Sequence, residues 1–478
     1  MEPLAASPRL SLLLGVIRAL VGRGLGAAGQ LVVTMVLGRL YGADGTGAIM
    51  LGLTAMLVLS LIGRLGLDFA LLRIASQAWE QRDQPRLWSA LFAATRIALV
   101  GSLVLAACLL LLTPWLAVSV FDDPRLTGVL PWFAVAIPAY ALLSLWCEAH
   151  KAIDRPGAGN FLHTAAIPVG FLLIQALLYW SDARTNPSGI DHAVIRGVQQ
   201  ADRPTYWTTV PMASAAYALA VWSAAGCALV SLTRAAGPWR LGPSDDWKAM
   251  RTAGIPLLVF SLFTMAGSWL PLLLLGYFAD SQAVGQFGAA ARLAILIMFI
   301  LLACNSVIPA RFARLHASGD LTAIRRLAGN SSLLMTLIAL PLALLMIFFG
   351  DFFLGWLGSD FRAASGALAI LAAAQLVNVA TGSVGYLLIM TGHEQQLRRA
   401  GMFGFFVNLV GCLCWIPHWG ILGAAWAAAL AIVTENLTAT WLAYRQIGVV
   451  CLPWLPRTAA SMARSHSISP TATGDAHG

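Results

Sequence analysis

The stretch WSALFAATRIALVGSLVLAACLLLLT, residues 88–113, holds a single charged side chain, Arg96, in 26 positions. An α-helix rises 1.5 Å per residue, so this stretch would extend roughly 39 Å, more than the roughly 30 Å of a bilayer's hydrocarbon core. A surface helix of a soluble protein would carry a polar face along that length. The stretch therefore predicts a transmembrane helix.

Eleven other apolar runs share these properties and are separated by polar loops. Together with the first they cover residues 11–38, 46–72, 88–113, 129–149, 159–180, 211–233, 252–278, 284–309, 331–350, 363–391, 400–417 and 420–444. Hydrophobic residues make up 59% of the 478-residue chain and charged residues 11%, and the mean hydropathy is +0.77. Soluble domains carry about 25% charged residues, so a soluble protein is excluded. We predict an all-α polytopic membrane protein with about twelve transmembrane helices.

The Lys and Arg residues outside the spans predict the orientation of the chain. If the N-terminus is cytoplasmic, 19 of the 30 basic residues fall in inner segments and 6 in outer ones. Because inner loops are enriched in Lys and Arg, we expect a multi-pass protein of a bacterial inner membrane with both termini in the cytoplasm. The basic residues behind the net charge of +9 are spread over short loops and do not cluster into a binding face, so no nucleic acid is expected as a partner. The segment 451–478 is predicted to be a flexible cytoplasmic tail.

Five arginines lie inside the predicted spans: Arg18, Arg23, Arg64, Arg96 and Arg292. A charged side chain at the centre of a bilayer costs roughly 2.5–3.5 kcal/mol on insertion scales, so each needs water, a carboxylate or an anionic ligand. The acidic residues within or at the edges of the spans are too few to pair with all of them, namely Asp68, Glu148 and Glu435. The excess of positive charge predicts a wet cavity that binds an anion.

Arginine suits such a cavity because its planar guanidinium matches the oxygens of phosphate and carboxylate groups. At 1.5 Å per residue, Arg23 and Arg64 lie roughly 18 and 13 Å from the inner edge of their spans, near one depth. Arg18 and Arg96 are open to a second interpretation, in which they extend to lipid headgroups or pair with carboxylates near the interface.

Two similar segments half a chain apart indicate an internal duplication. LGRLYGADGTG, residues 37–47, follows the first span, and LGYFADSQAVG, residues 275–285, follows the seventh. An offset of 238 residues aligns three identical pairs, Leu37 with Leu275, Gly38 with Gly276 and Gly47 with Gly285. Six helices per half leave both halves in the same orientation, so the repeat is parallel. We predict two six-helix lobes, residues 1–240 and 241–450, around a central cavity.

The chain resembles the oligosaccharide flippases of the multidrug/oligosaccharidyl-lipid/polysaccharide superfamily. The resemblance is carried by LGRLYGADGTGAIMLGL (37–53), GRLGLDFALLRIAS (63–76) and LGYFADSQAVGQFGAAARL (275–293). It implies a two-lobe bundle that moves undecaprenyl-diphosphate-linked sugar units from the cytoplasmic to the periplasmic leaflet by alternating access. It also implies that arginines on the first, second and eighth helices hold the diphosphate or acidic sugars. Those helices carry Arg18, Arg23, Arg64 and Arg292.

The lipid II flippase branch of that family has two further C-terminal helices, which this chain lacks. The resemblance therefore implies an O-antigen, capsule or exopolysaccharide unit rather than a murein precursor. The expected partners are the lipid-linked oligosaccharide, the bilayer, a polysaccharide polymerase and a chain-length regulator.

Asp68 and Glu435 are the candidate residues for coupling transport to Na+ or H+, although Asp68 lies one helical turn from Arg64 and could be its structural partner. No metal site or other cofactor is expected. Two other functions stay open. One is a cation-coupled multidrug extruder of the same superfamily. The other is a membrane polymerase or ligase of lipid-linked glycans that uses the outer loop 181–210. No HExxH or GxSxG motif occurs, so we expect a transporter rather than an enzyme.

Overall fold

A computed structural model describes the chain except for residues 1–7, 186–208, 238–245, 306–307 and 450–478. Some side chains inside the described helices, among them those of residues 8–25 and 246–257, are also outside the description. The predicted tail 451–478, most of the loop 181–210 and the lobe boundary at 240 fall in the gaps. The described part of the chain is helical, without strands.

The first lobe is built from seven described helices and a one-turn π-helix, Leu116–Val120, that extends the third. The helices are α1 (Pro8–Gly63), α2 (Leu67–Glu80), α3 (Gln84–Trp115), α4 (Leu126–Ala152), α5 (Pro156–Thr164), α6 (Ala166–Thr185) and α8 (Val210–Ala236).

The second lobe repeats this plan, with a 3-10 turn at Ser359–Ala364. Its described helices are α9 (Asp246–Phe278), α10 (Ser281–Cys304), α11 (Ile308–Ala317), α12 (Leu321–Phe348), α13 (Gly350–Gly355), α14 (Ser365–Ala380), α15 (Val384–Met390) and α16 (Glu394–Ile447).

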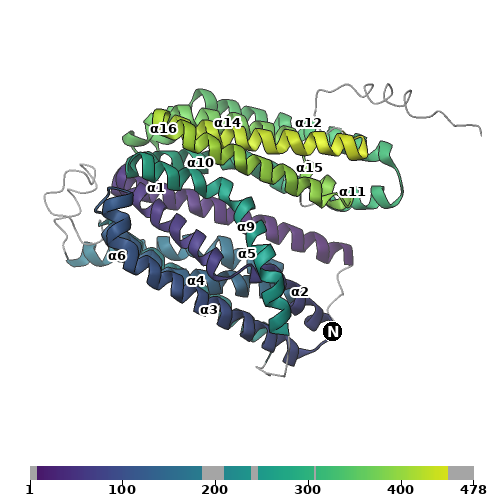
Figure 1. The fold of residues 1–478 in the computed structure, drawn as a ribbon, viewed down its shortest axis with the longest axis horizontal. Coiled ribbons are helices and arrows are strands. Elements are labelled where there is room, and N and C mark those ends of the chain that lie inside the picture. Colours follow the sequence, from purple (N-terminus) through teal and green to yellow (C-terminus); the bar gives the residue numbers. More distant parts are fainter. Residues whose placement is uncertain (1–7, 186–208, 238–245, 306–307, 450–478) are drawn as a thin grey trace, which may run out of the picture.

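These helices account for the twelve predicted spans. Eight helices in the described residues are long and apolar enough to cross a membrane, and the bent pair α5 and α6 forms another span. The helices α1 and α16 each reverse direction at a glycine with non-helical backbone, Gly42 and Gly420, so each contains two spans (Figure 1). Together with α9, the described helices form two lobes of six spans.

Breaks within four spans are the main departure from the predicted continuous helices. The second span is interrupted at Leu65 and Gly66, which both have left-handed φ angles of 51° and 69°. The fifth bends by 44° between α5 and α6. The eighth stops at Cys304 and resumes at Ile308, and the tenth stops at Ala380 and resumes at Val384. Helix breaks at membrane depth are tolerated where protein or water can satisfy the freed backbone groups, and Gly66, Ala165 and Gly382 at three of these breaks are buried.

The two lobes cross where the duplicated segments meet. A Cβ atom on Gly47 would lie 2.9 Å from the Gly285 nitrogen, and a Cβ atom on Gly285 would lie 2.9 Å from the Gly47 nitrogen. The Cβ atom on Gly47 would also clash with the carbonyl oxygen of Ser281, and the one on Gly285 with the carbonyl oxygen of Ala43. Ala43 and Ser281 are themselves 238 residues apart. Contacts that repeat in both directions mark a two-fold axis, so the axis of the duplication passes between these glycines.

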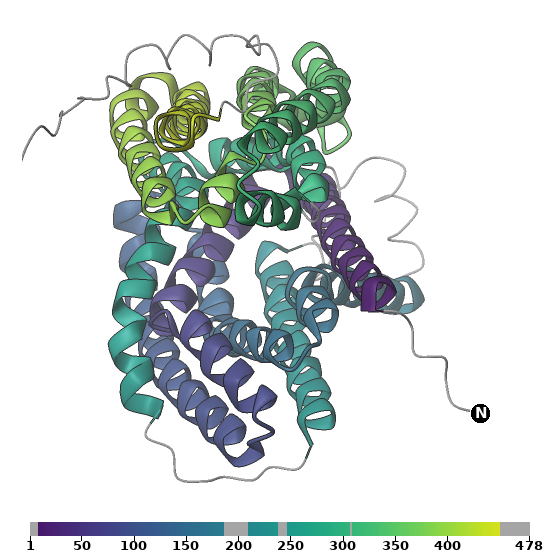
Figure 2. The same cartoon turned by 90° about the vertical axis from the view of Figure 1, so that its right-hand side faces the viewer.

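The lobes meet at this end of the molecule and diverge towards the end where α1 begins (Figure 1). Arg39 Nε donates to the Trp356 carbonyl oxygen across 2.9 Å, and Ser281 Oγ donates to Asp123 Oδ2 across 2.5 Å. Both bonds join one lobe to the other. At the opposite end α9 leaves its own lobe and runs beside α2, as seen at the left of Figure 2.

We predict that Gly47→Ala destabilises the protein by about 1–3 kcal/mol or more, because overpacking a close backbone crossing forces the helices apart. Thermal unfolding in detergent, followed by tryptophan fluorescence, measures the effect. Gly329→Ala is the control, because a Cβ atom at Gly329 meets no atom within 4 Å. Equal unfolding temperatures for the Gly47 variant and wild type would contradict the close crossing.

Candidate functional site

Arg292 lies on the face of α10 that contacts the other lobe. Gly285, Gly288 and Arg292 follow one another at intervals of three and four residues and so share a face of the helix. Gly285 meets Gly47 and Gly288 meets Met50, both in the first lobe. The Arg292 side chain continues this line of contacts one turn further from the crossing.

The guanidinium of Arg292 is held by neutral acceptors of α1. Its Nη1 donates to Thr34 Oγ1. When the Gln30 amide is turned so that its oxygen faces the guanidinium, that oxygen accepts from Nη1 at 3.3 Å and from Nη2 at 3.0 Å. No carboxylate pairs with Arg292 among the described residues, so its charge is uncompensated between the lobes.

Arg64 occupies the break in the second span and is paired. Its Nη1 lies 2.9 Å from Asp68 Oδ1, and its Nε donates to the Ser60 carbonyl oxygen across 3.2 Å. The side chains are only 9% and 15% exposed. Arg64 follows the last turn of α1 and Asp68 lies in the first turn of α2, so each charge lies at the helix end whose dipole favours it. The sequence left open whether Asp68 is a coupling site or a partner of Arg64, and here it is that partner.

Three polar side chains that the sequence analysis did not single out lie near this pair. Ser144 Oγ of α4 lies 3.4 Å from His163 Nε2 of α5, and the rings of Tyr140 and His163 are 5.9 Å apart. Tyr140 and His163 both lie within electrostatic reach of Arg64. The histidine is the one signal in the sequence that could have indicated this group, because imidazoles are rare inside membrane spans.

The other predicted site residues lie elsewhere or outside the description. The side chains of Arg18 and Arg23 are among those not described. Arg96 lies on the exposed face of α3, with its guanidinium carbon 6.0 Å from the centre of the Phe92 ring. Glu435 lies in the second lobe, exposed, with its Cβ packed against Gly404. The structure therefore places the Arg64–Asp68 pair inside the first lobe and Arg292 between the lobes, and it leaves Arg96 on the periphery.

Comparisons with known proteins address the fold and the class of function. No protein-family model matches the chain. The lipid II flippase MurJ, in an inward closed conformation, superposes with a TM-score of 0.68 over 90% of this chain and 87% of MurJ, at 9% sequence identity. The MATE multidrug transporter DinF-BH superposes with a TM-score of 0.62 over 92% of this chain and 96% of its own, at 17% identity.

The chain therefore has the fold that MurJ and DinF-BH share. The two-lobe, twelve-helix architecture predicted from the sequence is confirmed. These two proteins are a flippase and a multidrug transporter, the class of function that the sequence predicts.

One curated relative is similar in sequence. The probable low-salt glycan biosynthesis flippase Agl15 of Haloferax volcanii is 26% identical over 171 residues. The match spans about a third of each protein, 36% of this chain and 36% of Agl15.

We predict that Asp68→Asn strands the Arg64 cation in the interior, which typically costs about 3–5 kcal/mol for a buried pair. The double variant Arg64→Met with Asp68→Leu removes both charges and should recover most of that stability. Thermal unfolding of single and double variants in detergent measures the difference. An Asp68→Asn variant as stable as wild type would show that the pair is not structural.

Proposed function

We propose that this protein is a flippase for polyprenyl-diphosphate-linked oligosaccharides. It would move undecaprenyl-diphosphate-linked units from the cytoplasmic to the periplasmic leaflet of a bacterial inner membrane by alternating access. The units would serve O-antigen, capsule or exopolysaccharide export, with a polymerase and a chain-length regulator as partners. The support comes from the glycan flippase Agl15 and from the shared fold with MurJ.

The observation that carries the proposal is the uncompensated charge of Arg292 between the lobes. Neutral acceptors on α1 hold this guanidinium. A diphosphate offers charged acceptors, and hydrogen bonds between charged groups are roughly twice as strong as neutral ones. A diphosphate entering between the lobes would therefore take Arg292 from Gln30 and Thr34. Losing those bonds loosens the contact between α1 and α10, which couples substrate binding to movement of the lobes.

We predict that Arg292→Ala reduces glycan export roughly 10- to 100-fold, the equivalent of losing about 1.5–3 kcal/mol of charge-assisted bonding. A strain lacking its own polysaccharide flippase is complemented with each variant at matched expression, and surface glycan is quantified. Arg96→Ala is the matched control, because it removes the same charge from the exposed face of α3. It should export as wild type does.

The outcomes separate the function from the site. Failure of wild type to restore surface glycan with any of several repeat units would count against the flippase. Export by both wild type and Arg292→Ala would leave the flippase and remove Arg292 from its site. The fold is shared with a multidrug transporter, so drug resistance is measured in the same strains. Resistance without restored glycan would identify a multidrug extruder instead.

Coupling to Na+ or H+ is proposed to rest on Glu435 rather than Asp68. Asp68 is committed to Arg64, whereas Glu435 has no ion-pair partner in the described part of the chain. We predict that Glu435→Gln lowers export and makes the remainder insensitive to an uncoupler and to replacement of Na+ by K+. Asp320→Asn, which alters an exposed N-cap carboxylate of α12, is the control. Export by Glu435→Gln that keeps wild-type rate and sensitivity would remove the residue from coupling.

A further inference from the structure

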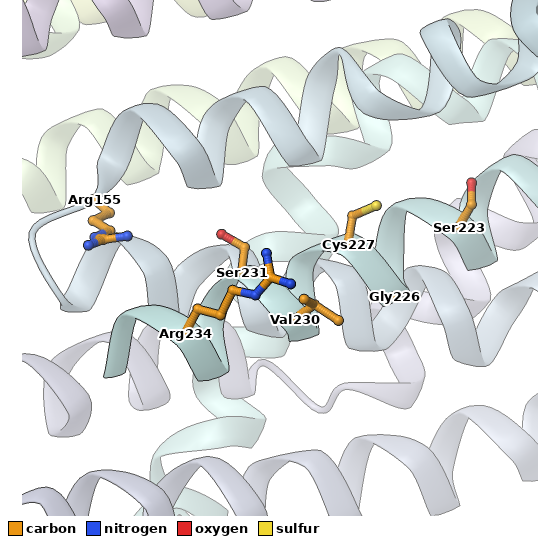
Figure 3. A pocket seen from close by; sticks show the side chains of 7 residues that line it. All are labelled: Arg155, Ser223, Gly226, Cys227, Val230, Ser231 and Arg234. Carbon is orange, nitrogen blue, oxygen red and sulfur yellow. The ribbon is translucent and has the colours of Figure 1, made fainter. Parts of the chain in front are cut away.

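A pocket of about 570 Å³ lies on the first lobe, away from Arg64 and Arg292, between α8 and the turn that precedes α5. Its lining residues are Arg155, Ser223, Gly226, Cys227, Val230, Ser231 and Arg234. Figure 3 shows Ser223, Cys227 and Ser231 pointing to one side of α8, the side on which Arg155 lies. These three residues are spaced by four along the helix, so they form a continuous furrow.

The bend in the fifth span creates this furrow. Near Ser223, α6 and α8 are in close contact: a Cβ atom on Gly170 would lie 3.4 Å from Ala220 Cβ and 3.6 Å from Ser223 Oγ. Beyond that point α5 turns by 44° from the direction of α6, and Gly226, Cys227 and Val230 on α8 are exposed. From Ser223 to Arg234 the furrow extends roughly 16 Å along the helix.

Two arginines lie at one end of the furrow, which is the cytoplasmic end according to the orientation predicted from the sequence. Arg234 is in the last turn of α8, and Arg155 is the residue before the first turn of α5. Both side chains are exposed, and neither guanidinium has an ion-pair partner within the described residues. Two guanidiniums on separate elements can bind the oxygens of one phosphate from two sides.

Among the other lining residues, the two serine hydroxyls already donate within the protein and the Cys227 thiol is only a weak donor, so the rest of the furrow is poorly suited to a sugar. Ser223 Oγ donates to the Ala220 carbonyl oxygen across 2.9 Å. His150 Nδ1 lies 2.8 Å from the Trp146 carbonyl oxygen, so Nδ1 carries the proton and the neutral ring accepts at Nε2. Ser231 Oγ, 3.1 Å from Nε2, therefore donates to the histidine. The furrow pairs a cationic mouth with a floor of small side chains whose hydroxyl protons are already used.

The flanks of the furrow are apolar and exposed. Leu219 and Trp222 on α8 are 57% and 43% exposed, and Val169 and Leu173 on α6 are 45% and 60% exposed. In a membrane such faces contact lipid chains. A ligand that fits this site has an anionic head, an apolar chain and access from the lipid, and an inner-leaflet lipid has all three.

We propose that the furrow binds one phosphate-headed lipid of the inner leaflet, with its phosphate between Arg155 and Arg234 and its chain along Ser231, Cys227 and Ser223. The phosphate could belong to an anionic phospholipid or to a prenyl diphosphate. This site is separate from the proposed transport site at Arg292, and its test does not depend on transport.

Cys227 provides the readout because it is exposed and lies in the furrow. The protein, with Cys108, Cys304, Cys414 and Cys451 replaced by Ser, is reconstituted in nanodiscs. The nanodiscs contain phosphatidylcholine alone, phosphatidylcholine with phosphatidylglycerol, or phosphatidylcholine with geranylgeranyl diphosphate. The rate of Cys227 modification by N-ethylmaleimide is measured by mass spectrometry, and the lipids retained are identified by native mass spectrometry.

We expect an anionic lipid to slow Cys227 modification several-fold. The double variant Arg155→Ala with Arg234→Ala should abolish this protection. The control double variant Arg326→Ala with Arg398→Ala removes two exposed arginines of the second lobe and should keep it. Gly226→Leu is the second test, because it fills the furrow with both arginines in place. A Cβ atom at Gly226 meets no atom within 4 Å, so the variant should fold and retain less lipid.

Protection by phosphatidylglycerol would identify a bulk phospholipid site, and protection by geranylgeranyl diphosphate alone would identify a site selective for prenyl carriers. Either outcome supports the proposal if the arginine pair is required. Modification at the same rate in all three nanodiscs would overturn it. Protection that persists without Arg155 and Arg234, or that is lost equally in the control variant, would overturn it as well.

Discussion

The close crossing of Gly47 and Gly285 is the contact on which the arrangement of the two lobes depends. Each backbone occupies the space where the other glycine would place a Cβ atom, so the crossing tolerates no larger residue. Because the same contact is made in both directions, the two lobes are related across it by the two-fold axis of the duplication. Further along α10, Gly288 contacts Met50 and Arg292 contacts Gln30 and Thr34, at increasing distance from this crossing. A rotation of the lobes about this crossing, as the proposed alternating access requires, would displace Arg292 more than Gly285.

Helix breaks recur at related positions in the two lobes. The offset of 238 residues places the break at Arg64–Gly66 opposite residues 302–304, and α10 ends at Cys304. In the duplicated second and eighth spans the first helix therefore ends at nearly the same distance from the crossing. In the first lobe the free helix ends are satisfied by an ion pair whose charges match the two dipoles. A charged pair at such a point is less costly than the same pair in a continuous helix, because the backbone supplies part of its solvation. That accounts for a buried arginine in a span without requiring a ligand for it.

The sequence predicted the parts of the fold that arise from local composition. All twelve spans, the two lobes and their parallel relation follow from apolar length and from the spacing of a short repeat. The breaks were missed because an interrupted span and a continuous one have the same hydropathy. The Arg64–Asp68 pair was within reach of the sequence because its partners are four residues apart. The partners of Arg292 were not, because Gln30 and Thr34 are more than 250 residues away and only the packing of the lobes brings them together.

The three arginines whose side chains can be compared show why residue type alone does not identify a transport site. Arg64 has a carboxylate, Arg96 has an exposed position beside Phe92, and Arg292 has only neutral acceptors. The insertion cost is similar for each. It is offset by an ion pair for Arg64, by access to the surface for Arg96 and by weak polar contacts for Arg292. Of these three means, only the last leaves a guanidinium that gains substantially when an anion arrives. The sequence counted five cations as one set, whereas the fold separates them by what each already binds. An arginine held by neutral groups between the lobes is the arrangement in which ligand binding and a change in the relative position of the lobes would act on the same bonds.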